Sequence, residues 1–218
     1  MRLRNIRGSK EEIENDVFVI KDPDKYKGKW DEVFKNNNPI HIEIGMGKGQ
    51  FILNKANNNP DINYIGIEKY SSVLYRALQR RKDFCREKSI DLSNIRFLRF
   101  DAEEIISIFG ENDVARIYLN FSDPWPKERH AKRRLTSDEF LDKYDKVLKK
   151  NGEIIFKTDN RRLFDFSVES INESKWNIKE ITYDLHNSEY IKGNIVTEYE
   201  ERFVMEGIPI CRLVTNRE

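Results

Sequence analysis

A glycine-rich turn follows the first apolar run of the chain and carries the first candidate for chemistry. Gly45, Gly47 and Gly49 come directly after a predicted strand at 40–44, and Glu43 stands two residues ahead of the first glycine. Glycines let the backbone turn sharply and approach a ligand closely. A carboxylate at position 43 suits a ligand that carries an ammonium or sulfonium group, and it would repel a pyrophosphate. The turn therefore predicts a nucleoside site, and the alternative is a tight strand-to-helix turn without a ligand.

Two more acidic residues close the next two predicted strands. Glu68 ends the second strand and can accept both hydroxyls of an adenosine ribose, and Asp101 follows the third and can accept from an adenine amino group. A glycine-rich turn with an acid after the second strand also describes dinucleotide-binding domains, so a nicotinamide-dependent oxidoreductase is an alternative. The spacing G-x-G-x-G, rather than G-x-G-x-x-G, favours a different nucleoside ligand.

The fourth predicted strand leads into the sequence Asn-Phe-Ser-Asp-Pro-Trp-Pro-Lys, residues 120–127. Two prolines and a tryptophan indicate a rigid loop, with Asp123 at the mouth of the ligand site. Residues 127–134 then hold five basic residues and one acid, and their place beside the loop favours contact with phosphates. The basic residues at 76–82 are partly neutralised by Asp83 and Glu87, which favours a solvated helix face. The arginines at 2, 4 and 7 fit either an RNA-binding arm or a tail.

Short apolar runs alternate with amphipathic stretches from position 39 onward. Helices are predicted at 71–88 and at 137–150, the second ended by Asn151-Gly152. This alternation predicts an α/β fold with a doubly wound, mainly parallel sheet. Residues 1–35 are expected to pack on a single domain at 36–218, and 197–206 fit helix or strand equally well. The predicted strands are 40–44, 64–68, 95–100, 116–121 and 153–158, with closing strands at 177–183 and 211–215.

Composition excludes several classes of protein. The chain of 218 residues has a formal net charge of +1, so any polyanion site must be a local patch. No run of about 18 apolar residues predicts a membrane span, and the N-terminus lacks the apolar stretch of a secretory signal. Cys85 and Cys211 are far apart and the three histidines are dispersed, so no metal site is expected. We expect a cytoplasmic protein with reduced thiols.

Three further segments complete a recognisable set of motifs. Residues 120–134, Lys-Thr-Asp-Asn at 157–160 and Thr-Glu-Tyr-Glu at 197–200 closely resemble the bacterial tRNA (guanine-N(7)-)-methyltransferases. The resemblance covers almost the whole chain, and the Ser-Asp-Pro-Trp-Pro-Lys loop with its basic continuation is its most specific part. The resemblance to this family also includes the segments 26–30, 39–51, 63–68, 133–136 and 185–188.

The resemblance implies a Rossmann-like class I methyltransferase that uses S-adenosylmethionine and releases S-adenosylhomocysteine. It implies a guanosine in the variable loop of tRNA as substrate, and the family includes monomers and homodimers. A class I methyltransferase acting on another RNA, a protein or a small molecule is the alternative. The implied cofactor contacts are Glu43, Gly45, Gly47, Gly49, Glu68, Asp101 and Asp123; the implied guanine contacts are Lys127, Asp159, Thr197, Glu198, Tyr199 and Glu200; and the implied RNA contacts are Arg129, His130, Lys132, Arg133 and Arg134.

The chemistry of the implied reaction limits what the residues must do. Guanine N-7 has a free lone pair, so no general base is needed. Catalysis then depends chiefly on positioning the two reactants, with Asp123 as the expected catalytic residue. Asp123 and Asp159 are suited to stabilise the cationic product, and Glu200 is suited to read the donor edge of guanine. In A-form RNA the N-7 edge is inaccessible, so the target base must leave the helix.

Overall fold

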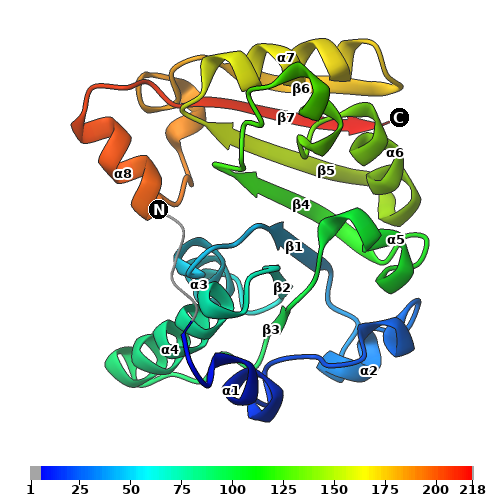
Figure 1. The fold of residues 1–218 in the computed structure, drawn as a ribbon, viewed down its shortest axis with the longest axis vertical. Helices are drawn as coiled ribbons and strands as arrows, with labels where there is room; N and C mark the ends of the chain where they lie inside the picture. Colours follow the sequence, from blue (N-terminus) through cyan, green and yellow to red (C-terminus); the bar gives the residue numbers. More distant parts are fainter. Residues whose placement is uncertain (1–5, 218) are drawn as a thin grey trace.

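The computed structural model describes residues 6–217, which form a seven-stranded sheet with helices packed on it (Figure 1). Arg2 and Arg4 of the expected N-terminal arm lie outside the described residues. The strands are β1 Ile40–Ile44, β2 Asn63–Ile67, β3 Ile95–Leu98, β4 Val114–Asn120, β5 Leu148–Thr158, β6 Trp176–Thr182 and β7 Cys211–Arg217. The α-helices are α1 Ser9–Asn15, α2 Asp31–Phe34, α3 Gln50–Asn58, α4 Ser71–Lys88, α5 Ile105–Ile108, α6 Asp138–Val147, α7 Arg161–Asn172 and α8 Glu198–Met205. Short 3-10 turns are η1 Pro23–Tyr26, η2 Ala102–Glu104, η3 Glu128–Arg133, η4 Leu185–Asn187 and η5 Glu189–Ile191.

The strand order is β3-β2-β1-β4-β5-β7-β6, and it reverses between β1 and β4. The pairs from β3 through β5 are parallel, whereas β7 runs antiparallel between β5 and β6. In Figure 1 the arrowheads of β4 and β5 point toward α8, and β7 points the other way. The predicted doubly wound, mainly parallel sheet is confirmed.

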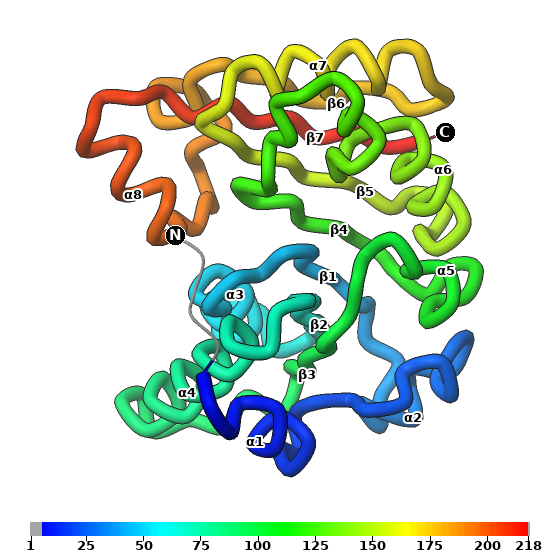
Figure 2. Tube along the Cα trace, viewed as in Figure 1, coloured from blue at the N-terminus to red at the C-terminus, as the bar shows by residue number. Residues whose placement is uncertain are grey.

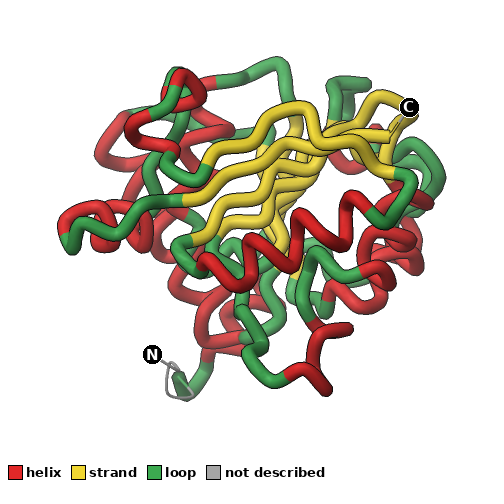
Figure 3. The backbone as a smooth tube through the Cα atoms, turned by 90° about the horizontal axis from the view of Figure 1, so that it is seen from above, coloured by secondary structure: helices red, strands yellow, loops and turns green. Residues whose placement is uncertain are grey.

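Alternating residues of the strands supply two cores, one on each face of the sheet. On one face Ile42, Ile117 and Phe156 join a cluster with α5, α6 and α7. On the other face Tyr64 and Tyr118 join a cluster with α1, α3 and α4. Figure 3 shows the strands as one twisted layer between helices. This arrangement leaves the carboxyl ends of the parallel strands free to form a site.

The N-terminal segment packs on the first of these cores. Trp30 is buried, its ring stacks on Phe109 with centroids 5.0 Å apart, and its indole N–H donates to the carbonyl of Ile108. Phe34 is buried in the same cluster. Further toward the N-terminus, α1 packs against α4 on the opposite face, as the trace in Figure 2 allows the reader to follow.

The boundary predicted between the helix at 137–150 and the strand at 153–158 is wrong, because β5 already begins at Leu148. The helix expected at 137–150 ends at Val147, and Asn151-Gly152 lies inside β5 instead of ending the helix. The pairing of β4 with β5 is irregular at this point. Val114 pairs with Leu148 and Arg116 pairs with Glu153, so the intervening segment of β5 is longer than that of β4. A Cβ on Gly152 would lie 2.9 Å from the carbonyl oxygen of Lys149. The glycine is therefore explained by a close backbone approach in a bulge and not by a helix end.

Residues 197–206, which fitted helix or strand equally well, form the helix α8 after Thr197. The Thr197 hydroxyl accepts from the backbone N–H of Glu200, and the Glu200 carboxylate accepts from the N–H of Thr197. This capping box satisfies two amides that would otherwise lack partners at the start of a helix. The sequence Thr-Glu-Tyr-Glu at 197–200 therefore forms the N-terminal cap of α8.

Candidate active site

A cavity of about 860 Å³ opens at the carboxyl edge of the parallel strands. Its walls are the turn after β1, the residues after β2 and β3, the loop after β4, and the beginning of α8. This is the edge at which doubly wound sheets bind ligands. Most of the predicted site residues meet here: Glu43, Gly45, Gly47, Gly49, Glu68, Asp101, Asp123, Arg133, Thr197, Glu198 and Tyr199 line the cavity.

The turn after β1 requires its glycines for conformational reasons. The φ angles of Gly45, Gly47 and Gly49 are 71°, 58° and 77°, in the left-handed region that side chains disfavour. A Cβ on Gly45 or Gly47 would meet open space, so packing does not demand a glycine at those two positions. The turn therefore presents bare backbone to the cavity before α3 begins at Gln50.

Glu43 lies at the floor of the cavity and is only partly satisfied. Asn120 at the end of β4 donates from Nδ2 to Glu43 Oε1 over 2.9 Å, while Oε2 has no hydrogen-bond partner within residues 6–217. Burial raises the pKa of Glu43 to about 8, and the Asn120 hydrogen bond opposes the shift. Oδ1 of Asn120 also lacks a partner in the described chain. A ligand ammonium would supply the donors that these two buried oxygens lack.

Glu68 and Asp101 stand at the ends of β2 and β3. Glu68 is nearly buried, and it accepts from the backbone N–H of Tyr70 over 3.0 Å; burial raises its pKa. Burial also acts to raise the pKa of Asp101, but hydrogen bonds from the Glu103 amide and from Lys69, 3.1 Å away, outweigh it and leave the pKa below its ordinary value. The two carboxylates fit the hydroxyl and amino donors of an adenosine.

The loop after β4 is held in a strained conformation. Phe121 and Trp125 have φ angles of 52° and 42°, which are uncommon for bulky residues. Arg134 donates from Nε to the carbonyl of Pro124 and from Nη2 to that of Trp125. Strain of this kind persists only when the surroundings impose it. The Arg134 hydrogen bonds hold the loop at Pro124 and Trp125, and the N–H of Phe121 donates to the carbonyl of Lys157 over 2.9 Å. Asp123 is exposed at the mouth of the cavity.

The basic strip, residues 127–134, forms η3 and flanks the mouth of the cavity. Arg129 and Lys132 are exposed, and Lys132 pairs with Glu139 over 2.7 Å. Arg133 lies over the Trp125 ring, 5.1 Å from its centroid, and His130 meets the same ring edge-on. The strip thus packs against the loop and exposes charge beside it, but Arg134 is occupied within the loop.

The comparisons with known proteins agree on a family. A family model described as "Putative methyltransferase" matches residues 37–213. A tRNA (guanine-N(7)-)-methyltransferase of Lachnoclostridium phytofermentans is 62% identical over 218 residues, which is 100% of this chain and 99% of that one. The chain belongs to the tRNA (guanine-N(7)-)-methyltransferase family. A member from Bacillus subtilis is 52% identical over 199 residues, 91% of this chain and 90% of that one.

Solved structures of methyltransferases share the fold of this family member. The 16S rRNA methyltransferase KamB superposes with a TM-score of 0.64 at 13% identity, covering 88% of this chain and 94% of that one. A structure titled "Structure of an Antibiotic Related Methyltransferase" gives a TM-score of 0.61 at 19% identity, with 88% and 94% covered. At these identities the likeness shows the Rossmann-like class I methyltransferase fold.

Three of the expected guanine contacts lie elsewhere. Lys127 and Asp159 follow β4 and β5 but do not line the cavity, and burial raises the pKa of Asp159. Glu200, in the first turn of α8, is fully buried, and neighbouring donors engage both of its carboxylate oxygens. Thr197, Glu198 and Tyr199 do line the cavity.

Several residues at the site were not predicted from the sequence. Asn120 holds Glu43, and Arg80 of α4 and Lys48 of the glycine-rich turn both pair with Glu198. Lys157 pairs with Glu200 over 2.6 Å. The Lys-Thr-Asp sequence at the end of a strand was a signal for Lys157, because strand ends at this edge reach the site. Arg80 carried no such signal, since its partner lies 118 positions away.

Among residues 6–217, no helix is both long enough and apolar enough to span a membrane. The same residues contain no group of three or more His, Cys, Asp and Glu side chains arranged to hold a metal ion.

Proposed function

We propose that this protein transfers a methyl group from S-adenosylmethionine to N-7 of a guanosine in the variable loop of tRNA, in the cytoplasm. The observation that carries the proposal is the 62% identity, over the full length, with a tRNA (guanine-N(7)-)-methyltransferase. The cavity at the carboxyl edge supports it, because its size and its carboxylate and amide oxygens, which accept hydrogen bonds, fit a nucleoside with an ammonium group.

Different residues around the cavity are suited to bind different groups of the cofactor. Glu43 is suited to the ammonium group, Glu68 to the ribose hydroxyls and Asp101 to the adenine amino group. The backbone of Gly45, Gly47 and Gly49 lines the same cavity, while the N–H groups of Gly45 and Gly49 donate to the carbonyls of Ile67 and Met46 and so hold the turn in place. When bound, S-adenosylmethionine supplies an electrophilic methyl group, and S-adenosylhomocysteine is left after transfer.

Guanine N-7 carries an available lone pair, so the protein has no proton to remove before the attack. Holding the base in line with the methyl group is then the main contribution, and such positioning supplies roughly 7–11 kcal/mol in favourable cases. Asp123 stands at the mouth of the cavity, where its carboxylate can stabilise the cationic base. We assign this role to Asp123 rather than to Asp159, which lies outside the cavity lining.

Substrate recognition divides between the strip and α8. Arg129, His130, Lys132 and Arg133 are placed to contact phosphates beside the cavity, which positions the RNA without reading its sequence. Glu198 and Tyr199 are the candidates to contact the base itself, since they line the cavity. Arg134 and Glu200 are better suited to hold the loop and the helix than to touch RNA.

The experiment is methyl transfer from labelled S-adenosylmethionine to a panel of acceptors: unmodified tRNA transcripts, a ribosomal RNA fragment, total protein and free guanosine. We expect label in tRNA only. Label in protein or free guanosine, with tRNA unlabelled, would favour the alternative of a class I methyltransferase with a different acceptor.

A further inference from the structure

α8 forms one wall of the cavity, and it is attached in an unusual way. Of its eight residues only Glu200 is buried, while Tyr199, Val204 and Met205 are exposed. A surface helix normally docks by burying an apolar stripe. In α8 the residue in that position is a carboxylate, so the helix is fixed mainly by polar contacts near its N-terminus.

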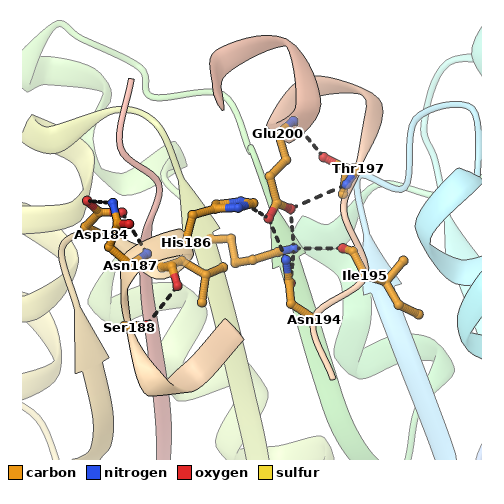
Figure 4. A network of polar contacts seen from close by, with 10 residues as sticks. Asp184, His186, Asn187, Ser188, Asn194, Ile195, Thr197 and Glu200 are labelled. Carbon is orange, nitrogen blue, oxygen red and sulfur yellow. Dashed lines mark hydrogen bonds and ion pairs between the residues drawn. The ribbon is translucent and has the colours of Figure 1, made fainter. Parts of the chain in front are cut away.

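Those contacts converge on Lys157 near the end of β5. Figure 4 shows three of the residues involved, Glu200, Asn194 and Ile195, close together. Its ammonium donates to Glu200 Oε2 over 2.6 Å, to Asn194 Oδ1 over 2.9 Å and to the carbonyl of Ile195 over 3.1 Å. An ammonium has three donors, and all three are used here. Burial lowers the pKa of Lys157, and the Glu200 carboxylate opposes that shift.

Glu200 in turn collects donors from three parts of the chain. Besides Lys157, its carboxylate accepts from His186 Nε2 over 2.9 Å, from Asn194 Nδ2 over 2.6 Å and from the N–H of Thr197. These residues come from β5, the turn after β6 and the segment that leads into α8. A single buried carboxylate therefore sets where α8 begins and how it lies against the sheet.

The same helix carries the side of the cavity that faces the loop after β4. Tyr199 and Phe203 stack on Phe121 with ring centroids 6.4 Å and 6.1 Å away, and Thr197 and Glu198 line the cavity. Phe121 lies two residues before Asp123. A shift of α8 would consequently move the part of the cavity wall that adjoins this loop, and no residue of α8 belongs to either hydrophobic core.

A buried ion pair contributes little net stability, because desolvation offsets the attraction, but its hydrogen bonds are directional. We propose that Lys157 and Glu200 are positioning residues that hold α8 against the acceptor side of the cavity. They act through the position of Thr197, Glu198 and Tyr199, and they do not touch the reacting atoms. The kinetic consequence rests on the proposed methylation of tRNA, whereas the position of the helix does not.

The test is the double variant Lys157→Met/Glu200→Met, which replaces both charges by apolar chains of similar length. Removing one partner alone would leave a buried charge and could unfold the protein, whereas replacing both is often neutral. We expect the unfolding temperature to stay within about 5 °C of wild type and hydrogen exchange of residues 197–205 to accelerate at least about tenfold. We expect kcat/KM for tRNA to fall about 100-fold, the effect of a misplacement near 1 Å, with S-adenosylhomocysteine affinity changed less.

Glu153→Gln is the matched control. Glu153 lies on the same strand and pairs with Arg116 and Lys179, but it does not line the cavity. We expect this variant to lose both ion pairs and to keep its methylation rate and the hydrogen-exchange protection of α8. A double variant that methylates tRNA at the wild-type rate, or whose α8 exchanges as slowly as wild type, would overturn the proposal. If wild type itself does not methylate tRNA, the proposed function fails, and the exchange data still decide the position of α8.

Discussion

The carboxylates that border the cavity differ in their surroundings, and this difference assigns them different tasks. Glu43 is buried with one oxygen unsatisfied by residues 6–217, and Asp101 is paired with Lys69. Asp123 is exposed at the mouth. A buried carboxylate suits a fixed ligand cation, and an exposed one suits a charge that forms during the reaction.

Glu43 should make cofactor affinity depend on pH. Burial raises its pKa to about 8, so the ligand-free carboxyl is mostly neutral at pH 7. A ligand ammonium favours the ionised form, and the affinity for S-adenosylhomocysteine should therefore rise by up to about tenfold per pH unit below pH 8. Calorimetric titration between pH 6 and 8 measures the slope. Glu43→Gln should bind weakly and with little slope, and an equal slope in that variant would assign the pH dependence to another group.

Asp123 should matter for turnover more than for cofactor binding. Asp123→Asn preserves size and removes the charge that would stabilise the cationic guanine. Loss of one such electrostatic interaction costs about 100- to 1,000-fold in kcat. Single-turnover methylation at saturating tRNA measures it, with S-adenosylhomocysteine affinity as the control. A folded variant with a near wild-type rate would contradict the catalytic assignment.

At the scale of the elements, sequence patterns predicted those helices and turns that depend on interactions between residues close in the chain. The helix at 71–88 was predicted with its observed ends, because its apolar residues recur at helical spacing. Gly45, Gly47 and Gly49 were found because a turn at a strand end needs positive φ. Asn151-Gly152 was misread, since the same dipeptide serves a helix end and a bulge.

The features that the sequence did not predict depend on contacts between residues far apart in the chain. The Thr197 to Glu200 motif was assigned to substrate, although a Thr-x-x-Glu spacing also begins a helix. The burial of Glu200 depends on Lys157, His186 and Asn194. Hydrophobic periodicity in the sequence does not reveal contacts between polar residues that are far apart in the chain. Likewise, Arg134 was expected on RNA from the place of the basic strip beside the loop and from the family resemblance, and its guanidinium donates to carbonyls of that loop.

The basic strip should carry the salt dependence of RNA binding. Neutralising Arg129, Lys132 and Arg133 with glutamine removes three charges beside the mouth. For each phosphate that is no longer neutralised, the slope of log K against log salt should fall by about 0.7–0.9. Filter binding of tRNA from about 50 to 200 mM salt measures this.

Arg134→Gln is the matched control for the strip. Because its guanidinium is held by carbonyls of the loop after β4, we expect this variant to slow methylation through the loop and leave the salt slope unchanged. A slope that falls equally in the triple variant and in Arg134→Gln would place Arg134 on RNA after all.

The whole molecule combines a two-sided core with a polar edge that carries its function. Both cores are apolar and closed, whereas the cavity edge buries Glu43, Glu68, Lys157 and Glu200. Burying ionisable groups opposes folding unless they are paired or neutral. The site therefore makes the stability of the ligand-free protein sensitive to pH.

That sensitivity has a definite sign. The folded pKa of Glu43, about 8, lies above its ordinary value of 4.5. Its contribution to stability is present in full below pH 4.5 and is lost as pH rises through 8, at a rate of at most about 1.4 kcal/mol per pH unit. Urea unfolding of wild type and Glu43→Gln between pH 5 and 8 measures it. The variant should lose less stability over this window; parallel decline would show that Glu43 is ionised in the fold.

The most direct test of the central claim is to map the methylated atom. Wild-type protein, S-adenosylmethionine and an unmodified tRNA transcript are incubated together, and the RNA is then treated with borohydride and aniline, which cleave the chain at 7-methylguanosine. We predict cleavage at one guanosine of the variable loop, and none when that residue is 7-deazaguanosine. Methyl label in the tRNA without this cleavage would contradict transfer to N-7.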